Sequence, residues 1–395
     1  MPGNQDDPSE TLSLCVRCGR CRSVCPTFEL ELVETAVARG RVVLAEHLGE
    51  GMEPTQGLYR ILHTCLLCMA CEEVCTNGVP VAEIVQKGRE QLRRVTGTPR
   101  WKGALSWVLS HPRVMDHLCR AGGVMGLLAP KGREPRGLLL RVPRLVEEGV
   151  FLPPISASPF RRTCSGVDGE PRVLLFLGCL IDHCYPEVAK ATVGLLQGLG
   201  YGCLVPERQY CCGHPHFAMG FREEGERIVR LNTQVFEEAA PDLILTACAS
   251  CASTLKREYS LDAPVLDLVE LLQRHEDRLE VVLPPGVERV GWHQPCHLGR
   301  GQGIDGQGLV ERLLGSRFVS MENQTRCCGF GGTFSVEFSR LSAAIGADKA
   351  RWAKESGAQL VLTDCPACMM QLQRSFSSEG VEVAHIASVA KPRFA

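Results

Sequence analysis

Ten cysteines from residue 179 onward form two sets of five with nearly the same spacing. Each set has a single cysteine, then an adjacent pair followed by glycine, and finally two cysteines separated by two residues. The first set is Cys179, Cys211, Cys212, Cys248 and Cys251, and the second is Cys296, Cys327, Cys328, Cys365 and Cys368. Equivalent members lie 116 or 117 residues apart. Such a repeat indicates two copies of one structural unit.

The adjacent cysteines restrict what these sets can do. Neighbouring Cα atoms lie about 3.8 Å apart, whereas disulfides usually join Cα atoms at roughly 5.5 Å, so a disulfide within each pair would be strained. Buried free cysteines explain one or two positions but not ten in duplicated register. We therefore predict ligands to a centre with more than one metal atom, and Gly213 and Gly329 allow the backbone to approach it closely.

Each repeat alternates apolar, strand-like runs with helical periodicity. Strands are expected at 173–177, 242–245, 287–292 and 359–362, and helices at 187–199, 221–239, 305–315 and 335–356. Alternation of this kind predicts an α/β sheet, with ligands gathered beyond the carboxyl ends of the strands.

Eight further cysteines near the N-terminus repeat the spacing C-x2-C-x2-C-x3-C. They are Cys15, Cys18, Cys21 and Cys25 in one run and Cys65, Cys68, Cys71 and Cys75 in the other. This run holds cubane [4Fe-4S] clusters in two-cluster ferredoxins, where the fourth cysteine of each run binds the other cluster. The expected ligand sets are Cys15, Cys18, Cys21 and Cys75 for one cube, and Cys65, Cys68, Cys71 and Cys25 for the other. Zinc usually takes two separated C-x2-C pairs, which fits these triple-spaced runs poorly.

These patterns predict an N-terminal, mainly helical two-cluster ferredoxin-type domain followed by two duplicated α/β cysteine-rich domains. The expected divisions are 1–100 for the ferredoxin-type domain, 101–170 for a helical segment and linker, 171–286 for the first cysteine-rich domain and 287–395 for the second. Residues 30–50, between the two N-terminal runs, show helical periodicity. The apolar stripe of 101–150 fits packing against the chain or a partner, and a membrane surface is its less common use.

Composition excludes several classes of protein. A net charge of −2 without a basic block gives no support to nucleic-acid binding. The polar, acidic start does not resemble a secretory signal, and the apolar runs fall short of the roughly 20 residues that span a bilayer. The 22 cysteines cluster too tightly for an extracellular disulfide framework. We therefore expect a cytoplasmic protein with metal-bound thiolates.

The paired motifs resemble the cysteine-rich (CCG) domains of heterodisulfide reductase. The whole order of modules resembles the iron–sulfur subunit of glycolate oxidase and the related subunits of D-lactate and anaerobic glycerol-3-phosphate dehydrogenases. The stretches CVRCGRCRSVCPTF (15–28) and RGRVVLAEHL (39–48) are most similar to the glycolate oxidase subunit. The resemblance implies two cubane [4Fe-4S] clusters, and one or two further non-cubane [4Fe-4S] clusters at the CCG cysteines.

The resemblance also implies an electron-transfer subunit. It would relay electrons from an FAD-containing dehydrogenase subunit, acting on glycolate or D-lactate, to a quinone or another carrier, and would lie at the inner face of the membrane. The chain has no dinucleotide-binding or P-loop motif, so no catalytic residue is assigned to it. TACASC (246–251) and TDCPAC (363–368) are intact, whereas glycolate oxidase subunits often lose part of this C-x2-C. The catalytic subunit of membrane-type heterodisulfide reductase is also similar, and disulfide reduction is the alternative function.

Four histidines lie close to these cysteines in sequence, namely His214, His216, His293 and His297. They could tune potentials or move protons, but hydrogen-bonding or plain loop roles are commoner than metal ligation. The cysteines outside both patterns are expected to be structural, and they are Cys119, Cys164, Cys184 and Cys203.

Overall fold

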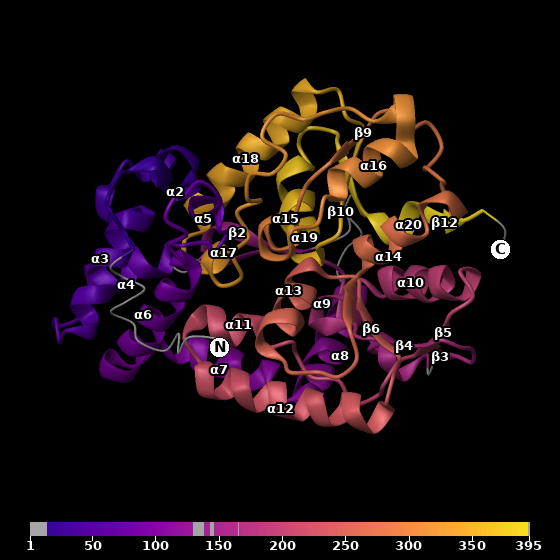
Figure 1. The fold of residues 1–395 in the computed structure, drawn as a ribbon, viewed down its shortest axis with the longest axis horizontal. Coiled ribbons are helices and arrows are strands. Elements are labelled where there is room, and N and C mark those ends of the chain that lie inside the picture. The colour runs from indigo at the N-terminus through magenta and orange to yellow at the C-terminus, as the bar shows by residue number, and fades with distance from the viewer. Residues whose placement is uncertain (1–13, 129–137, 143–145, 165, 394–395) are drawn as a thin grey trace.

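The computed structural model describes residues 14–128, 138–142, 146–164 and 166–393. A helical N-terminal body lies beside two α/β repeats, which are stacked on one another (Figure 1). The cysteine-rich repeats and the helical N-terminal module were both predicted from the sequence, and this fold class is confirmed. Among the described residues, no helix is both long and apolar enough to cross a membrane.

The N-terminal body is mainly helical. Its elements are η1 (Arg20–Val24), α2 (Pro26–Glu31), η2 (Glu34–Ala36), α3 (Ala38–Gly49), α4 (Gln56–His63), α5 (Ala70–Glu73) and α6 (Val81–Thr96). The apolar faces of α3 and α6 pack together through Val42, Ala45, Ile84 and Val85. This buried contact holds the two cysteine runs on either side of one small core.

The helix expected over 30–50 is shorter than predicted. Leu32 has a left-handed backbone (φ 54°) that ends α2, and α3 begins only at Ala38. The intervening turn folds back onto α3, where a Cβ on Gly40 would lie 2.4 Å from the Glu34 carbonyl oxygen. Only glycine permits that approach. Hydrophobic periodicity does not report such a backbone contact, so it did not reveal the break in the helix.

The first repeat contains a five-stranded sheet in the order β3-β5-β4-β6-β7. The strands are β3 (Gly166–Val167), β4 (Arg172–Leu175), β5 (Gly202–Leu204), β6 (Leu243–Thr246) and β7 (Val265–Asp267), all parallel except β3. The accompanying helices are α9 (Gly178–His183), α10 (Pro186–Gly198), α11 (His214–Met219), α12 (Arg222–Ala239), α13 (Ala249–Glu258) and α14 (Leu268–Arg274). Parallel strands linked by helices are the arrangement that the alternating pattern predicted.

The second repeat has the parallel strand order β11-β10-β9. Its strands are β9 (Val290–Trp292), β10 (Leu360–Thr363) and β11 (Glu382–His385), and its helices are α15 (Cys296–Gln302), α16 (Gly306–Leu314), α17 (Phe334–Glu337), α18 (Ser339–Glu355), α19 (Pro366–Phe376) and α20 (Ile386–Val389). A parallel bridge from Val290 to Phe318 takes the place of β5. The chain then returns to the first repeat, where β12 (Ala390–Pro392) pairs antiparallel with β8 (Leu279–Val281).

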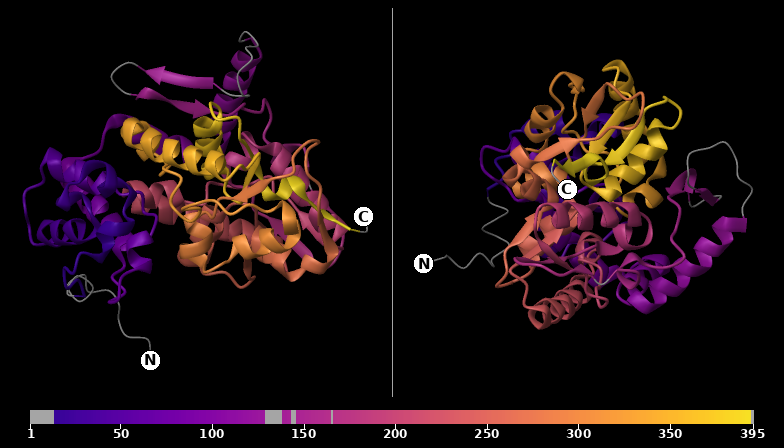
Figure 2. Two further views of the ribbon diagram at one scale, coloured as in Figure 1. Left: turned by 90° about the horizontal axis from the view of Figure 1, so that it is seen from above. Right: turned by 90° about the vertical axis from the view of Figure 1, so that its right-hand side faces the viewer.

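Two expectations for the connecting segments need correction. The helix expected over 335–356 is broken at Phe338 (φ −122°, ψ 50°), as the first repeat is broken at the equivalent Phe221 (φ −94°, ψ 60°). The helical segment and linker expected over 101–170 also contains a hairpin of β1 (Leu138–Val142) and β2 (Val146–Leu152), and β2 lies beside α17, α18 and α19 (Figure 2). Two helices precede the hairpin, α7 (Arg100–Leu109) and α8 (Pro112–Leu128).

Candidate metal centres

The N-terminal cysteines surround two separate cavities. Cys15, Cys18, Cys21 and Cys75 line the first, of about 440 Å³, and Cys25, Cys65, Cys68 and Cys71 line the second, of about 390 Å³. Cys71 also borders the first cavity. The fourth cysteine of each run thus lies beside the other run, and the crossed ligand pairing stays a prediction.

The loops that carry these cysteines have the same unusual backbone in both runs. Arg17 and Leu67 occupy equivalent places between the first and second cysteines, and both have left-handed backbones (φ 57° and 52°). Gly19 and Met69, one residue after the second cysteine, also have positive φ (87° and 59°). Left-handed non-glycine residues are strained and persist where the surroundings demand them. Here they curl each loop around its cavity.

The environment of the second cavity suits thiolates. The Arg41 guanidinium lies 3.9 Å from Cys25 Sγ, and the Leu67 backbone N–H donates to Cys65 Sγ at 3.5 Å. Burial raises the pKa of the Cys65 thiol, while Arg41 and Arg89 act to lower it. A bare thiolate would be costly in this setting, but thiolates shared with a positive metal centre would be satisfied.

All ten CCG cysteines line one cavity of about 1130 Å³ between the N-terminal body and the two repeats. The strands deliver them as predicted, because Cys248 follows β6 and caps α13, while Cys365 follows β10 and caps α19. The left-handed Gly213 and Gly329 (φ 92° and 88°) turn the chain after each adjacent pair. The repeats therefore direct both cysteine sets into a shared space.

The thiols follow one another in a row, each close enough to the next to affect its ionisation. The contacts in the first set are Cys179–Cys211, Cys211–Cys212, Cys212–Cys251 and Cys251–Cys248. Those in the second are Cys296–Cys327, Cys327–Cys328, Cys328–Cys368 (3.3 Å) and Cys368–Cys365. Cys248 joins the two sets through Cys365, and Cys68 of the N-terminal body contacts Cys327.

The second cysteine of each adjacent pair has a lowered pKa, and so does Cys365. Hydrogen bonds from Cys211 and Cys251 lower the pKa of Cys212 to about 6. Hydrogen bonds from Cys327 and Cys368 likewise hold the pKa of Cys328 well below its ordinary value. The thiolate is the form that binds metals, so both repeats favour that form at the same position.

The four nearby histidines lie in different environments. The rings of His214 and His297 meet edge to face with centroids 4.6 Å apart at the wall of the shared cavity. His216 instead lies within hydrogen-bonding distance of Ser110 and of the Ser106 carbonyl, both 3.1 Å away. His293 is buried behind the second set of cysteines, and neither of its ring nitrogens has a hydrogen-bond partner among the described residues.

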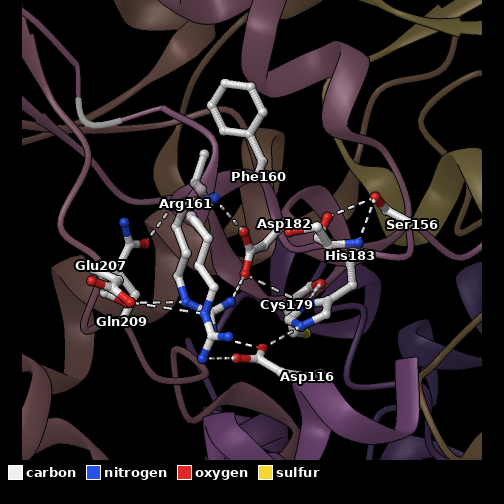
Figure 3. A network of polar contacts seen from close by, with 12 residues as sticks. Asp116, Ser156, Phe160, Arg161, Cys179, Asp182, His183, Glu207 and Gln209 are labelled. Atoms are coloured by element: carbon white, nitrogen blue, oxygen red, sulfur yellow. Dashed lines mark hydrogen bonds and ion pairs between the residues drawn. The ribbon is translucent and has the colours of Figure 1, made fainter. Parts of the chain in front are cut away.

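A buried ionic network lies behind Cys179 and was not predicted (Figure 3). Arg161 forms ion pairs with Asp182 and with Asp116 (2.6 Å), and its backbone N–H donates to Asp182 at 2.9 Å. His183 lies 3.0 Å from Asp116 through one ring nitrogen and 3.1 Å from the Cys179 carbonyl through the other. The network ties α8 to α9 and fixes the backbone of Cys179.

Electrostatics in this network favour the ionised form of Asp116. Burial alone would raise the pKa of Asp116, but hydrogen bonds from Arg161 and His183 and the charges of Arg161 and Arg162 bring it below its ordinary value. No local sequence signal points to this contact, because Asp116 and Arg161 are 45 residues apart in the chain.

A second buried acid pair also escaped the sequence analysis. Asp267 and Asp364 are fully buried where the repeats meet, and their side chains contact one another. Burial and the neighbouring Asp267 carboxyl raise the pKa of Asp364 well above its ordinary value. Burial at this site therefore favours the neutral form of the Asp364 carboxyl group.

The donor sets fit iron–sulfur clusters. Five cysteines line the first N-terminal cavity and four line the second, while the ten CCG cysteines and Cys65 line the shared cavity. Cluster irons bind thiolates, and two-cluster ferredoxins use four per cube. The remaining cysteines lie outside these sets, although burial and, to a lesser extent, the nearby Cys179 raise the pKa values of Cys119 and Cys184.

Comparison with known families agrees with this arrangement of modules. Residues 11–79 match the 4Fe-4S dicluster domain, and residues 173–256 and 290–373 each match the cysteine-rich domain (CCG). Lactate utilization protein A of Geobacillus sp. is 34% identical over 240 residues, covering 56% of this chain and 100% of that protein. The chain belongs to the family of iron–sulfur proteins that combine a 4Fe-4S dicluster domain with two CCG domains.

Longer relatives in the family extend the match over nearly the whole chain. A probable glycolate oxidase iron–sulfur subunit of Bacillus subtilis is 28% identical over 432 residues, covering 97% of this chain and 94% of that protein. A subunit of the fumarate reductase (CoM/CoB) of Methanothermobacter marburgensis is 27% identical, covering 95% of this chain and 71% of that protein. The resemblance inferred from the motifs is thus confirmed.

Proposed function

We propose that this protein is the electron-transfer subunit of a flavin-dependent 2-hydroxy-acid dehydrogenase. The observation that carries the proposal is the row of cysteine contacts that joins the N-terminal module to both CCG sets. Iron–sulfur clusters along such a row would carry single electrons between a surface site and the shared cavity. A glycolate- or D-lactate-oxidising partner is the best match, since relatives carry glycolate oxidase and lactate utilization names.

The surface end of this relay is at Cys18. Cys18 is exposed, whereas all the other cysteines of the chain are partly or fully buried. The cube held by Cys15, Cys18, Cys21 and Cys75 would therefore meet the partner. The cube held by Cys65, Cys68, Cys71 and Cys25 would pass electrons inward through the contact of Cys68 with Cys327.

The substrate would be oxidised on the partner. Removing a pair of electrons from a hydroxy acid needs an organic cofactor such as a flavin, and a reduced flavin can release its electrons singly to the clusters. The partner is accordingly an FAD-containing subunit, and the final acceptor a quinone or another carrier at the inner face of the membrane.

Purification from the native host tests this assignment. The chain should co-purify with a flavin-containing subunit, and the complex should reduce a dye with glycolate or D-lactate. The separated chain should keep its iron–sulfur absorption, contain no flavin and lack that activity. Hydroxy-acid oxidation by the flavin-free chain would contradict the proposal.

Disulfide reduction is a second candidate, favoured by the shape of the shared cavity. All ten CCG cysteines, with His214 and His297, border one space of about 1130 Å³. A small disulfide that entered this space would lie beside both cysteine sets. A heterodisulfide added to the reduced protein should then produce a new paramagnetic species and be cleaved to thiols, whereas the first proposal predicts neither.

A further inference from the structure

The two CCG sites differ at the residue that follows their central strands. His293 comes directly after β9, and its backbone N–H donates to the Leu362 carbonyl at 2.9 Å. The equivalent residue of the first repeat, 117 positions earlier, is Phe176. Phe176 is fully buried and packs edge to face against Phe236, with ring centroids 5.8 Å apart. An apolar side chain thus serves the first site where the second has an imidazole.

His293 is positioned to contact the second cysteine set. It is 1% exposed, and a ring nitrogen lies within 4.8 Å of both Cys328 Sγ and Cys368 Sγ. Neither ring nitrogen has a hydrogen-bond partner in the described part of the chain. The Gln324 carbonyl is close to the ring, but it already accepts from Lys349 Nζ at 3.1 Å and from the Gln294 N–H at 3.3 Å. An unpaired, buried N–H is costly, so this ring needs an acceptor, and the sulfurs of Cys328 and Cys368 lie nearby.

A second difference between the repeats also gives the second repeat a basic side chain at a position where the first has a neutral one. Lys349 on α18 is 3% exposed and donates to the carbonyls of Asn323 (2.6 Å) and Gln324. Its counterpart in the first repeat is Asn232, which accepts from the Tyr210 N–H and donates to the Cys211 carbonyl. Both residues hold the loop that precedes the adjacent cysteines, but the second repeat uses an amine where the first uses a neutral amide.

We propose that His293 donates a hydrogen bond from a ring N–H to a sulfur of the iron–sulfur cluster held by the second cysteine set. The five thiolates of the second set already outnumber the four irons of such a cluster, so the irons need no nitrogen ligand. The sulfur atoms, in contrast, can still accept hydrogen bonds. Hydrogen bonds to cluster sulfurs raise reduction potentials. The second site is therefore the more readily reduced of the two, and it is the one beside Cys68. His293 is a positioning and tuning residue, and the inference rests on the clusters proposed above.

Potentiometry monitored by EPR tests the inference on the full chain, purified anaerobically with its iron. Cys251→Ser and Cys368→Ser assign the signals of the first and second sites. His293→Phe, which copies the first repeat, should shift the midpoint of the second-site signal to a lower potential and leave the first unchanged. His293→Gln retains an N–H donor and should shift it less. His275→Phe is the matched control, because His275 lies beside Tyr201, away from both sites, and it should shift neither.

Labelling with ¹⁵N-histidine adds a readout that does not depend on potentials. Pulsed EPR should show a weak nitrogen coupling to the second-site cluster, which is lost in His293→Phe and kept in His275→Phe. An iron-loaded His293→Phe protein with an unchanged midpoint would overturn the inference, as would absence of the coupling in the wild type or a strong coupling typical of iron-bound nitrogen. If the His293→Phe protein does not bind iron, the nitrogen coupling in the wild type and the midpoint of His293→Gln test the inference instead. Absence of iron from the wild type would instead refute the proposed function.

Discussion

Cys68 of the N-terminal body and Cys327 of the second repeat are in side-chain contact, although 259 residues separate them in sequence. A shared apolar cluster, which includes Leu66, Phe334 and Ile345, surrounds this contact. The packing that joins the two modules thus also brings together two expected cluster ligands. Electron transfer between the modules needs no separate bridging element.

Changing Cys25 to Ser should damage the cluster held by Cys65, Cys68 and Cys71 and leave the cluster nearest in sequence. The fourth cysteine of each run crosses to the other cube, and Cys25 lines the same cavity as Cys65. EPR of the reduced protein, compared with Cys18→Ser and Cys68→Ser, identifies the affected cube. The crossed arrangement is wrong if Cys25→Ser and Cys18→Ser abolish the same signal.

Anaerobically purified protein should contain about sixteen iron atoms per chain, four in each of two cubes and two CCG sites. Metal and acid-labile sulfide analysis measures this directly. A value near eight would indicate that only half of the expected clusters are present. Zinc with little iron would contradict the assignment of all the cysteine sets.

Asp116→Asn should lower the free energy of unfolding by about 1.5–3 kcal/mol at neutral pH, as expected for a lost hydrogen bond to a charged group. The folded pKa of Asp116 is lowered, so its contribution is present at neutral pH and disappears only as the pH falls through that folded value. Urea unfolding measures the change. Glu207→Gln is the control, because the Glu207 side chain is 74% exposed and should have little effect. Equal midpoints for Asp116→Asn and the wild type would show that the network does not stabilise the fold.

Arg89→Lys should weaken the attachment of the N-terminal body to the first repeat. The buried guanidinium donates to the carbonyls of Leu62 (2.8 Å), Cys65 (2.6 Å) and Ala218 (2.5 Å). An ammonium group cannot reproduce this planar fork of donors. Limited proteolysis should cleave the variant between the modules faster than the wild type, whereas Arg94→Lys, at an exposed position, should not change the rate.

Much of this architecture could be predicted because the repeats carry their own signals. Apolar runs marked β4, β6, β9 and β10 to within a few residues, and the cysteine spacing placed the ligands beyond those strands. The hairpin of β1 and β2 and the ion pair of Arg161 with Asp116 depend on contacts between distant segments, which no local pattern encodes. The unpaired ring of His293 was equally hidden, since only packing shows that its described neighbours leave it without a partner.

The most direct test of the account is rapid mixing of the native complex with glycolate or D-lactate under anaerobic conditions. Cluster absorption should bleach after the flavin is reduced, and the same chain without its flavoprotein should not respond to either hydroxy acid. Bleaching of the isolated, flavin-free chain by a hydroxy acid would contradict the assignment of this protein as an electron-transfer subunit, as would clusters that stay oxidised while the flavin of the complex is reduced.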